Sequence, residues 1–218
     1  MAEDDLGLRK RGRTSEDEYF ARHDRELIET ERRKAADAAE LRRLGEALGL
    51  SDEELLAKLR AAGFGPSHAA LVPVMPALEV AWSDGAVGKA EGELLKEQLR
   101  RYSDGRQPSA EAIAKLDDFL LSRPPDHVFD QARRAAQIAV SKAGEGERRE
   151  LATRILAEAR AVAEAGGGLL GLGTVSTPER RALDALAAAL GVSTTCSVEA
   201  GNRVIARPLM IDRAATSN

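Results

Sequence analysis

Two carboxylates on either side of a short turn are the residues of this chain best placed for chemistry. Asp84 and Glu91 stand seven positions apart around an Asp-Gly step, and Ser83 comes directly before it. Hard divalent cations take oxygen ligands, six or more of them for Ca²⁺. The two carboxylates could supply two or three oxygens, and Ser83, backbone carbonyls and water would complete the shell. Asp84 and Glu91 are therefore a candidate site for calcium or magnesium.

The same residues also have a purely structural interpretation. Asp84 can end one helix, and Gly85 can adopt the positive φ that a tight turn requires. Glu91 can stabilise the start of the next helix through the helix dipole. The alternating acids of an EF-hand loop are missing. Both interpretations stay open on sequence grounds, and no other cofactor is indicated.

A glycine-rich segment resembles a nucleotide-binding motif without its context. Gly166, Gly168 and Gly171 form a G-x-G-x-x-G pattern. A dinucleotide fingerprint needs a strand before it and a helix directly after it. Here a helix is predicted before it, so we interpret residues 166–174 as a flexible connector.

The histidines and the single cysteine do not form a catalytic pattern. His23, His68 and His127 are far apart in sequence, and none has the spacing of a zinc motif. Cys196 has no basic neighbour closer than Arg203, which argues against an activated thiolate. The sequence therefore predicts a protein that is not an enzyme.

Composition favours helices and excludes several classes of partner. Of 218 residues, 43% are hydrophobic, mostly Ala, Leu and Val, and 3% are aromatic, which favours helix over sheet. Basic and acidic residues, 32 and 36 in number, are mixed along the chain and give a net charge of -4. We therefore expect no nucleic-acid partner. The single cysteine, the missing signal sequence and the absence of a long apolar run predict a soluble, cytoplasmic protein without a membrane span.

The N-terminal part is predicted to be a tail followed by a helical arm. Residues 1–14 are charged and are expected to be disordered. Ser15 and Glu18 form a capping box that should start a helix over residues 15–48. Its apolar row is thin and is interrupted by Lys34, so it does not predict a coiled coil. The row consists of Phe20, Leu27, Leu41 and Leu48. We expect this arm to bury only the ends of the row and to bind a protein partner; the oligomeric state is not predicted.

Residues 50–192 are predicted to form a helical bundle, followed by a weakly structured tail over residues 193–218 that could contain a hairpin. A second capping box at Ser51 should open a short helix ending at Gly63. Two prolines, Pro73 and Pro76, require the next apolar helix to start near them or to kink. Further helices are expected at 89–102, 109–121, 126–143, 147–165 and 177–191.

Two stretches of the predicted bundle share one plan. In each, an apolar helix runs into a turn that ends in a valine, Val87 or Val175. A glutamate follows four positions later, Glu91 or Glu179, and a leucine eight positions later. The pattern predicts an all-α fold in which two pseudo-symmetric helix-turn-helix halves, at about 65–122 and 123–192, form one bundle.

The first of these stretches resembles the signature of the TerB-like domains, the family named for tellurite resistance. The resemblance rests on residues 80–87, Val-Ala-Trp-Ser-Asp-Gly-Ala-Val, together with Glu91. In that family a helix ends in Ala-x-x-Asp-Gly and the next begins near a glutamate. The second stretch resembles a degenerate copy. The resemblance implies an all-helical fold, a role in stress response or interaction, and a divalent-cation site that transfers onto Asp84 and Glu91.

Three functional hypotheses follow from these observations. The first is a non-enzymatic TerB-like module for interaction or stress response. The second is a divalent-cation sensor, which requires Asp84 and Glu91 to converge. The third is an enzyme whose site is assembled only by folding and needs a cleft with paired acids or histidines.

Overall fold

A computed structural model describes residues 2–103, 107–166 and 175–192, and it describes side chains from Arg22 onward. These residues form helices and short turns, with no strand among them, which confirms the all-α prediction. The elements are α1 (Ala2–Leu48), α2 (Glu53–Ala61), η1 (Pro66–Val74), α3 (Met75–Ala81), η2 (Trp82–Asp84), α4 (Lys89–Arg101), α5 (Ala110–Leu121), α6 (Asp126–Lys142), α7 (Glu145–Gly166) and α8 (Thr177–Leu190). The predicted hairpin and Cys196 lie outside the described residues.

The chain divides into two units, residues 1–42 and residues 43–218. The first unit is helical from Ala2, so the prediction of a disordered tail over residues 1–14 and of a helix start at Ser15 was wrong. Residues 2–14 contain no proline, and seven of these thirteen residues are Leu, Arg, Lys or Glu, which favour helix. Because these residues can be helical themselves, the capping box at Ser15 lies inside a longer helix.

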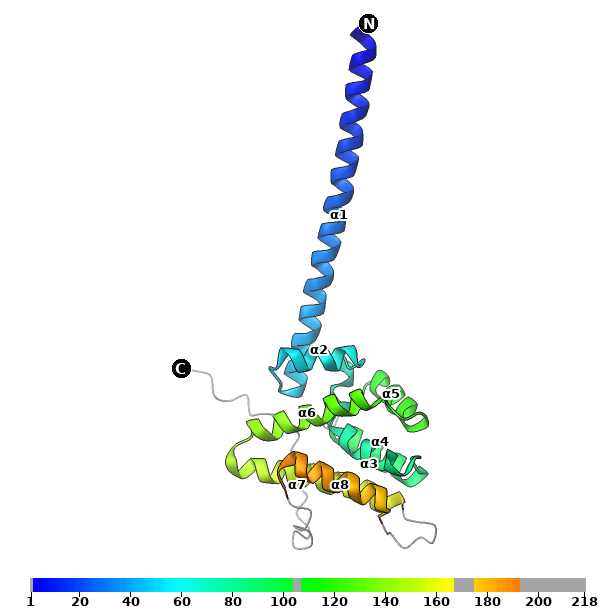
Figure 1. Ribbon diagram of the computed structural model, residues 1–218, viewed down its shortest axis with the longest axis vertical. Helices are drawn as coiled ribbons and strands as arrows, with labels where there is room; N and C mark the ends of the chain where they lie inside the picture. The colour runs from blue at the N-terminus through cyan, green and yellow to red at the C-terminus, as the bar shows by residue number, and fades with distance from the viewer. Residues whose placement is uncertain (1, 104–106, 167–174, 193–218) are drawn as a thin grey trace. The chain divides into compact units, whose positions relative to one another are not determined.

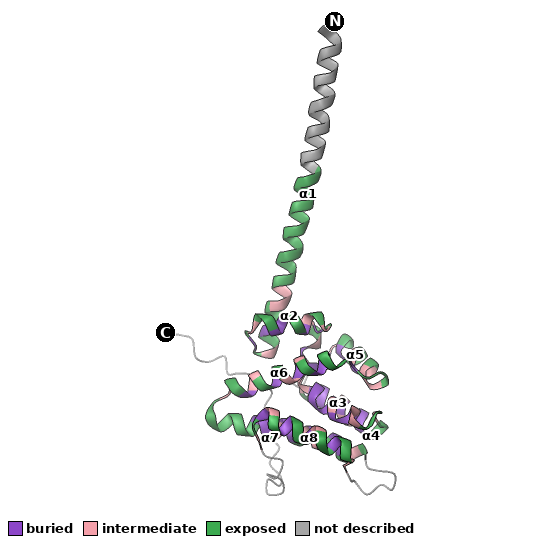
Figure 2. Ribbon diagram, in the orientation of Figure 1, coloured by how far each residue is buried: buried purple, intermediate pink, exposed green. Residues whose placement is uncertain are grey.

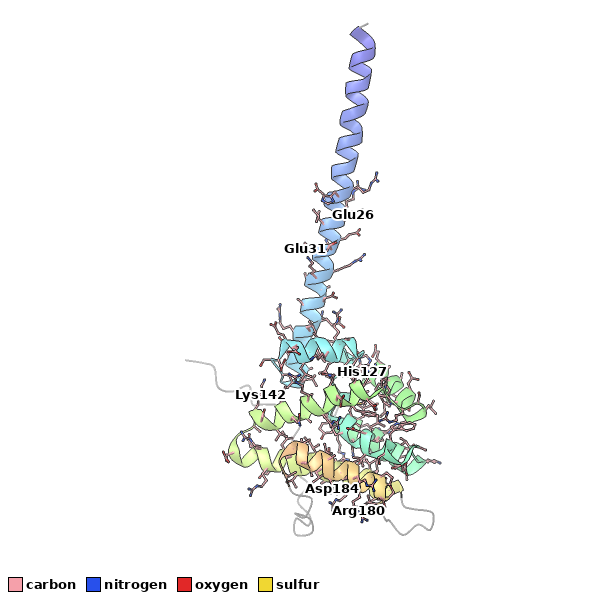
Figure 3. The ribbon with its side chains drawn as sticks, viewed as in Figure 1. Glu26, Glu31, His127, Lys142, Arg180 and Asp184 are labelled. Atoms are coloured by element: carbon pink, nitrogen blue, oxygen red, sulfur yellow. The ribbon has the colours of Figure 1, made fainter. Side chains whose placement is uncertain are left out.

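The described side chains of the first unit are mostly in contact with solvent. Residues 22–38 are exposed, and Figure 3 shows Glu26 and Glu31 projecting from α1. Leu27 and Ile28 are each 51% exposed, so the expectation that α1 buries Leu27 was wrong. The apolar row is too thin to bury itself, and these two residues stay exposed.

The last turns of α1 belong to the second unit. Leu44 is 1% exposed and Leu50 is also buried. Gly49 ends the helix with a φ of 64°. α2 is capped by Asp52, whose side chain accepts from the Leu55 amide at 2.9 Å. The sequence predicted Ser51 as the cap, but the observed cap is the next residue, Asp52.

Helix α3 forms the centre of the second unit. All of its residues except Glu79 are buried, and Figure 2 shows α3 coloured mostly as buried. The prolines have the predicted effect, because the chain runs as the 3₁₀ helix η1 up to Val74 and becomes α-helical only at Met75. Glu79 forms an ion pair with Arg133 of α6 at 3.2 Å.

The helices of the two predicted halves contact one another reciprocally. The helices that precede the two turns, α3 and α7, pack together; α4 packs on α7, and α8 packs on α3 and η2. Figure 1 shows α7 and α8 side by side at one face of this unit. The bounds of α4 to α8 agree with the predicted ranges to within two residues. Each helix that follows a turn, α4 or α8, therefore packs on the helix that precedes the other turn.

Polar side chains between α4 and α7 are bonded across the interface. Buried Gln98 donates from Nε2 to the Glu158 carbonyl at 3.1 Å. Tyr102 donates from its hydroxyl to Glu158 Oε2 at 2.5 Å. These bonds fix α4 along α7. Within the described residues, no helix combines the length and the apolar character that crossing a bilayer requires.

Candidate functional site

The predicted Asp-Gly turn is present at the end of α3. The helix tightens into η2, and Gly85 takes a φ of 103°, which favours glycine. Trp82 donates from Nε1 to the Phe119 carbonyl at 2.9 Å and so ties the turn to α5. Asp84 is exposed, and its Oδ1 accepts from the Ala86 amide at 3.3 Å. Asp84 therefore shapes the turn that leads into α4.

Glu91 lies at the third position of α4 with its side chain turned back toward the helix start. It is 3% exposed, and its Oε2 accepts from the Gly88 amide at 2.5 Å. This is one side of a capping box, which satisfies an amide that the helix leaves open. The other oxygen, Oε1, is buried and has no hydrogen-bond partner.

The buried oxygen of Glu91 faces the end of α7. A Cβ added to Gly166 would lie 2.9 Å from Glu91 Oε1 and 3.0 Å from its Cδ. A glycine at this position therefore lets the end of α7 come close to the carboxyl group. The same closeness removes water from that group.

Glu179 occupies the equivalent place at the start of α8. It is also 3% exposed, and its Oε2 accepts from the Ser176 amide at 2.6 Å. Here the box is complete, because Ser176 Oγ accepts from the Glu179 amide at 3.3 Å. The N-cap residues Gly88 and Ser176 have nearly the same backbone angles, with ψ of 162° in both.

Burial raises the pKa of Glu91 to about 7. The hydrogen bond from Gly88 acts in the opposite direction, and repulsion from the carboxylates of Glu179 and Asp84 raises the pKa further. Glu91 therefore ionises near neutral pH. The two capping glutamates are close enough for the charge of one to affect the proton affinity of the other.

Glu91 lies against Gly166, and its pKa is affected more by the charge of buried Glu179 than by that of exposed Asp84. A cation held here would draw on the Oε1 of Glu91 and on the carboxylate of Glu179. Among the side chains that the structure describes, no three His, Cys, Asp or Glu residues form a metal-binding group. The prediction of Asp84 and Glu91 as metal ligands stays a prediction.

Sequence reasoning found Glu179 as a counterpart of Glu91 but did not place it in the same site. The available signal was the equal distance of each glutamate from its valine, Val87 or Val175. Gly166 was recognised as part of the glycine segment, but no sequence signal connected it to Glu91.

The remaining sequence candidates have ordinary structural surroundings. His68 accepts through Nδ1 from the Gly65 amide at 3.1 Å, which caps η1. His127 is exposed near the start of α6, where Figure 3 labels it, and His23 is exposed on α1. Residues 167–174 of the glycine segment lie outside the described residues.

Comparisons with known proteins add no relative to these observations. No family model, curated protein or solved structure matches this chain.

Proposed function

We propose that this chain is a non-enzymatic helical interaction module of the TerB-like type, in which a divalent cation binds between the starts of α4 and α8. The observation that carries the proposal is the buried Oε1 of Glu91, which has no hydrogen-bond partner. It belongs to a carboxyl group whose pKa is raised in part by the charge of a second buried carboxylate, Glu179. Two acids close together repel each other when both ionise. A divalent cation between them would remove that repulsion, with Ca²⁺ or Mg²⁺ as the favoured ions.

Cation binding is expected to compete with the proton on Glu91. The pKa of Glu91 is about 7, so a substantial fraction of the protein carries this proton at neutral pH. Metal ligands must be deprotonated, and affinity therefore rises with pH. Binding would stabilise the packing of α4 and α8 on α7. In a sensor, this change in packing would alter the surface that these helices present to a partner.

The test is thermal unfolding at pH 8 in millimolar CaCl₂ or MgCl₂, with NaCl of equal ionic strength as reference. Cation at a hundredfold excess over its Kd should stabilise the wild type by about 2.7 kcal/mol. Glu91→Gln and Glu179→Gln should each lose this response. An unchanged melting temperature of the wild type would refute the cation part of the proposal.

The interaction part of the proposal assigns a protein partner to the exposed stretch of α1. Leu27 and Ile28 form an exposed apolar pair among charged neighbours, which fits an apolar groove with a charged rim on another protein. We propose a cytoplasmic setting, on the basis of the single Cys196. Photo-crosslinking from position 27 should give one defined adduct in a native lysate, and crosslinking from exposed position 184 on α8 should not.

The enzyme alternative has less support from the described residues. Proton transfer by Glu91 would need a substrate next to Oε1, but this atom is buried against Gly166. The arrangement is better suited to holding a small cation than to reaching a substrate.

A further inference from the structure

A cavity of about 310 Å³ lies within the second unit, away from the capping glutamates. Its walls come from the end of α1, from η1, α6 and α7, and from Tyr102 and Ser103 directly after α4. The volume is at the lower end of the range of small-molecule pockets. The proposed function assigns no role to this cavity.

Small side chains create the space. Ala69 and Ala70 line it from η1, and Ala135, Ala136 and Ala139 line it from α6. An alanine side chain ends at Cβ, so facing helical segments leave a gap that larger residues would fill. Most of the wall is therefore apolar, with Val72 and Ile155 adding larger surfaces.

No charged side chain lines the cavity, and no histidine does. A ligand that carried a charge into it would lose hydration without gaining an ionic partner, which is strongly unfavourable. The occupant that fits this wall is neutral.

The polar side chains of the wall are the hydroxyls of Ser67, Tyr102, Ser103 and Ser109 and the exposed amide of Gln107. Tyr102 gives its proton to Glu158 Oε2 at 2.5 Å, and Ser103 gives its proton to the Leu99 carbonyl at 2.8 Å. Each oxygen retains lone pairs, so each can accept a further hydrogen bond but cannot donate one. A ligand that makes a polar contact with these oxygens must therefore supply the donor.

We propose that this cavity binds a small neutral, mainly apolar molecule with one hydroxyl group, of the chemical class of medium-chain alcohols. The chain of the ligand lies against the alanines of η1 and α6. Its hydroxyl donates to the oxygen of Tyr102 or Ser103. This proposal is independent of cation binding at Glu91.

The test compares three probes of similar length on the full chain: octan-1-ol, octanoate and 1-methoxyoctane. Titration calorimetry should give saturable binding of octan-1-ol, and the methyl resonances of Leu48, Val72 and Ile155 should shift. Octanoate, which is charged, and 1-methoxyoctane, which has no donor, should each bind at least about tenfold more weakly. Equal affinity for all three would overturn the proposed polarity, and no binding of octan-1-ol would overturn the site.

Two variants locate the binding. Ala136→Leu fills the cavity and should weaken octan-1-ol binding at least about tenfold, whereas Ala157→Leu on the exposed side of α7 should leave it unchanged. If Ala136→Leu does not fold by circular dichroism, Ala139→Leu replaces it, because Ala139 is less buried. Equal binding by the filled and control variants would overturn the location. Contacts in the full chain between the cavity methyls and residues 209–211 would overturn the proposal in favour of an intramolecular occupant.

Discussion

The starts of α4 and α8 have the same design but differ in one essential contact. Each begins with an N-cap residue in extended conformation, followed three positions later by a glutamate that bonds back to the N-cap amide. In α8 the N-cap is Ser176, whose hydroxyl returns a bond to Glu179. In α4 the N-cap is Gly88, which has no side chain to do so.

The carboxylate oxygens of the two glutamates also differ in their hydrogen bonding. Glu91 has a buried oxygen without a partner, close to Gly166 of α7. Among the side chains that the structure describes, neither oxygen of Glu179 is buried without a hydrogen-bond partner. An unpaired buried acceptor normally destabilises a protein by about 1 to 3 kcal/mol. The first half therefore carries at Glu91 an unpaired buried acceptor that the second half does not repeat at Glu179.

The comparison is tested most strongly by removing the charge of Glu91. Its pKa is raised from 4.5 to about 7 in the folded protein, so the folded state holds this proton more tightly than the unfolded chain. The resulting stabilisation is complete below pH 4.5 and is lost as the pH rises to about 7. Glu91→Gln keeps a neutral group at all pH values. At pH 8 it should be more stable than the wild type by about 2 to 3 kcal/mol, measured by urea unfolding.

The pH series contains its own control. At pH 5 the wild-type carboxyl is mostly protonated, and the advantage of Glu91→Gln should largely disappear. A constant difference between pH 5 and pH 8 would contradict the raised pKa. Ala157→Gln, an exposed change in α7, should show no pH dependence relative to the wild type.

The next largest effect is expected at Gly166. An alanine there would place its Cβ within 2.9 Å of Glu91 Oε1, and Glu91 is held by its bond to Gly88. Gly166→Ala should destabilise the protein by about 1 to 2 kcal/mol. Gly146→Ala in the same helix is the matched control, because nothing lies within 4 Å of its added Cβ. A loss that persists in the Glu91→Ala background would show that the contact with Glu91 is not the cause.

Loss of the hydroxyl at Ser176 is the corresponding test in the second half. Ser176→Ala should lower the free energy of unfolding by about 1 kcal/mol, since the Glu179 amide loses its acceptor. Ser176→Gly places at the N-cap of α8 the residue type that α4 has at its own N-cap, Gly88. It should lower the free energy of unfolding by only a few tenths of a kcal/mol. Chemical denaturation of the two variants measures the difference. If alanine is tolerated as well as the wild-type serine, the serine bond does not stabilise α8.

Much of the fold could be predicted because local signals and burial agree. The turn glycines Gly85 and Gly191 both have positive φ, at 103° and 71°. Pro73 and Pro76 displaced the start of α3 as expected. The arm was predicted less well, because a capping box marks a possible start and does not prevent the residues before it from continuing a helix.

The site was only half predictable, for a geometric reason. The distance from Asp84 to Glu91 along the chain is visible in the sequence, but the approach of Gly166 and Glu179 depends on how α7 and α8 pack. Carboxylates on different helices have no spacing rule. The repeat alone related Glu179 to Glu91, and burial decided that these acids, and not Asp84, became inaccessible to water.

The smallest expected effect is at Asp84, and it decides between two versions of the cation site. Asp84 is exposed, and Asn would keep the oxygen that accepts from Ala86, so Asp84→Asn should change stability by less than about 0.5 kcal/mol. Removing its charge also removes one of the repulsions on Glu91, so the pH midpoint of the stability curve should move slightly downward. We expect the thermal response to Ca²⁺ or Mg²⁺ to survive in Asp84→Asn and to be lost in Glu179→Gln, because a cation between α4 and α8 needs the second buried carboxylate. Loss of the response in Asp84→Asn with retention in Glu179→Gln would instead place the ligands at Asp84 and Glu91 and make the second half a purely structural copy.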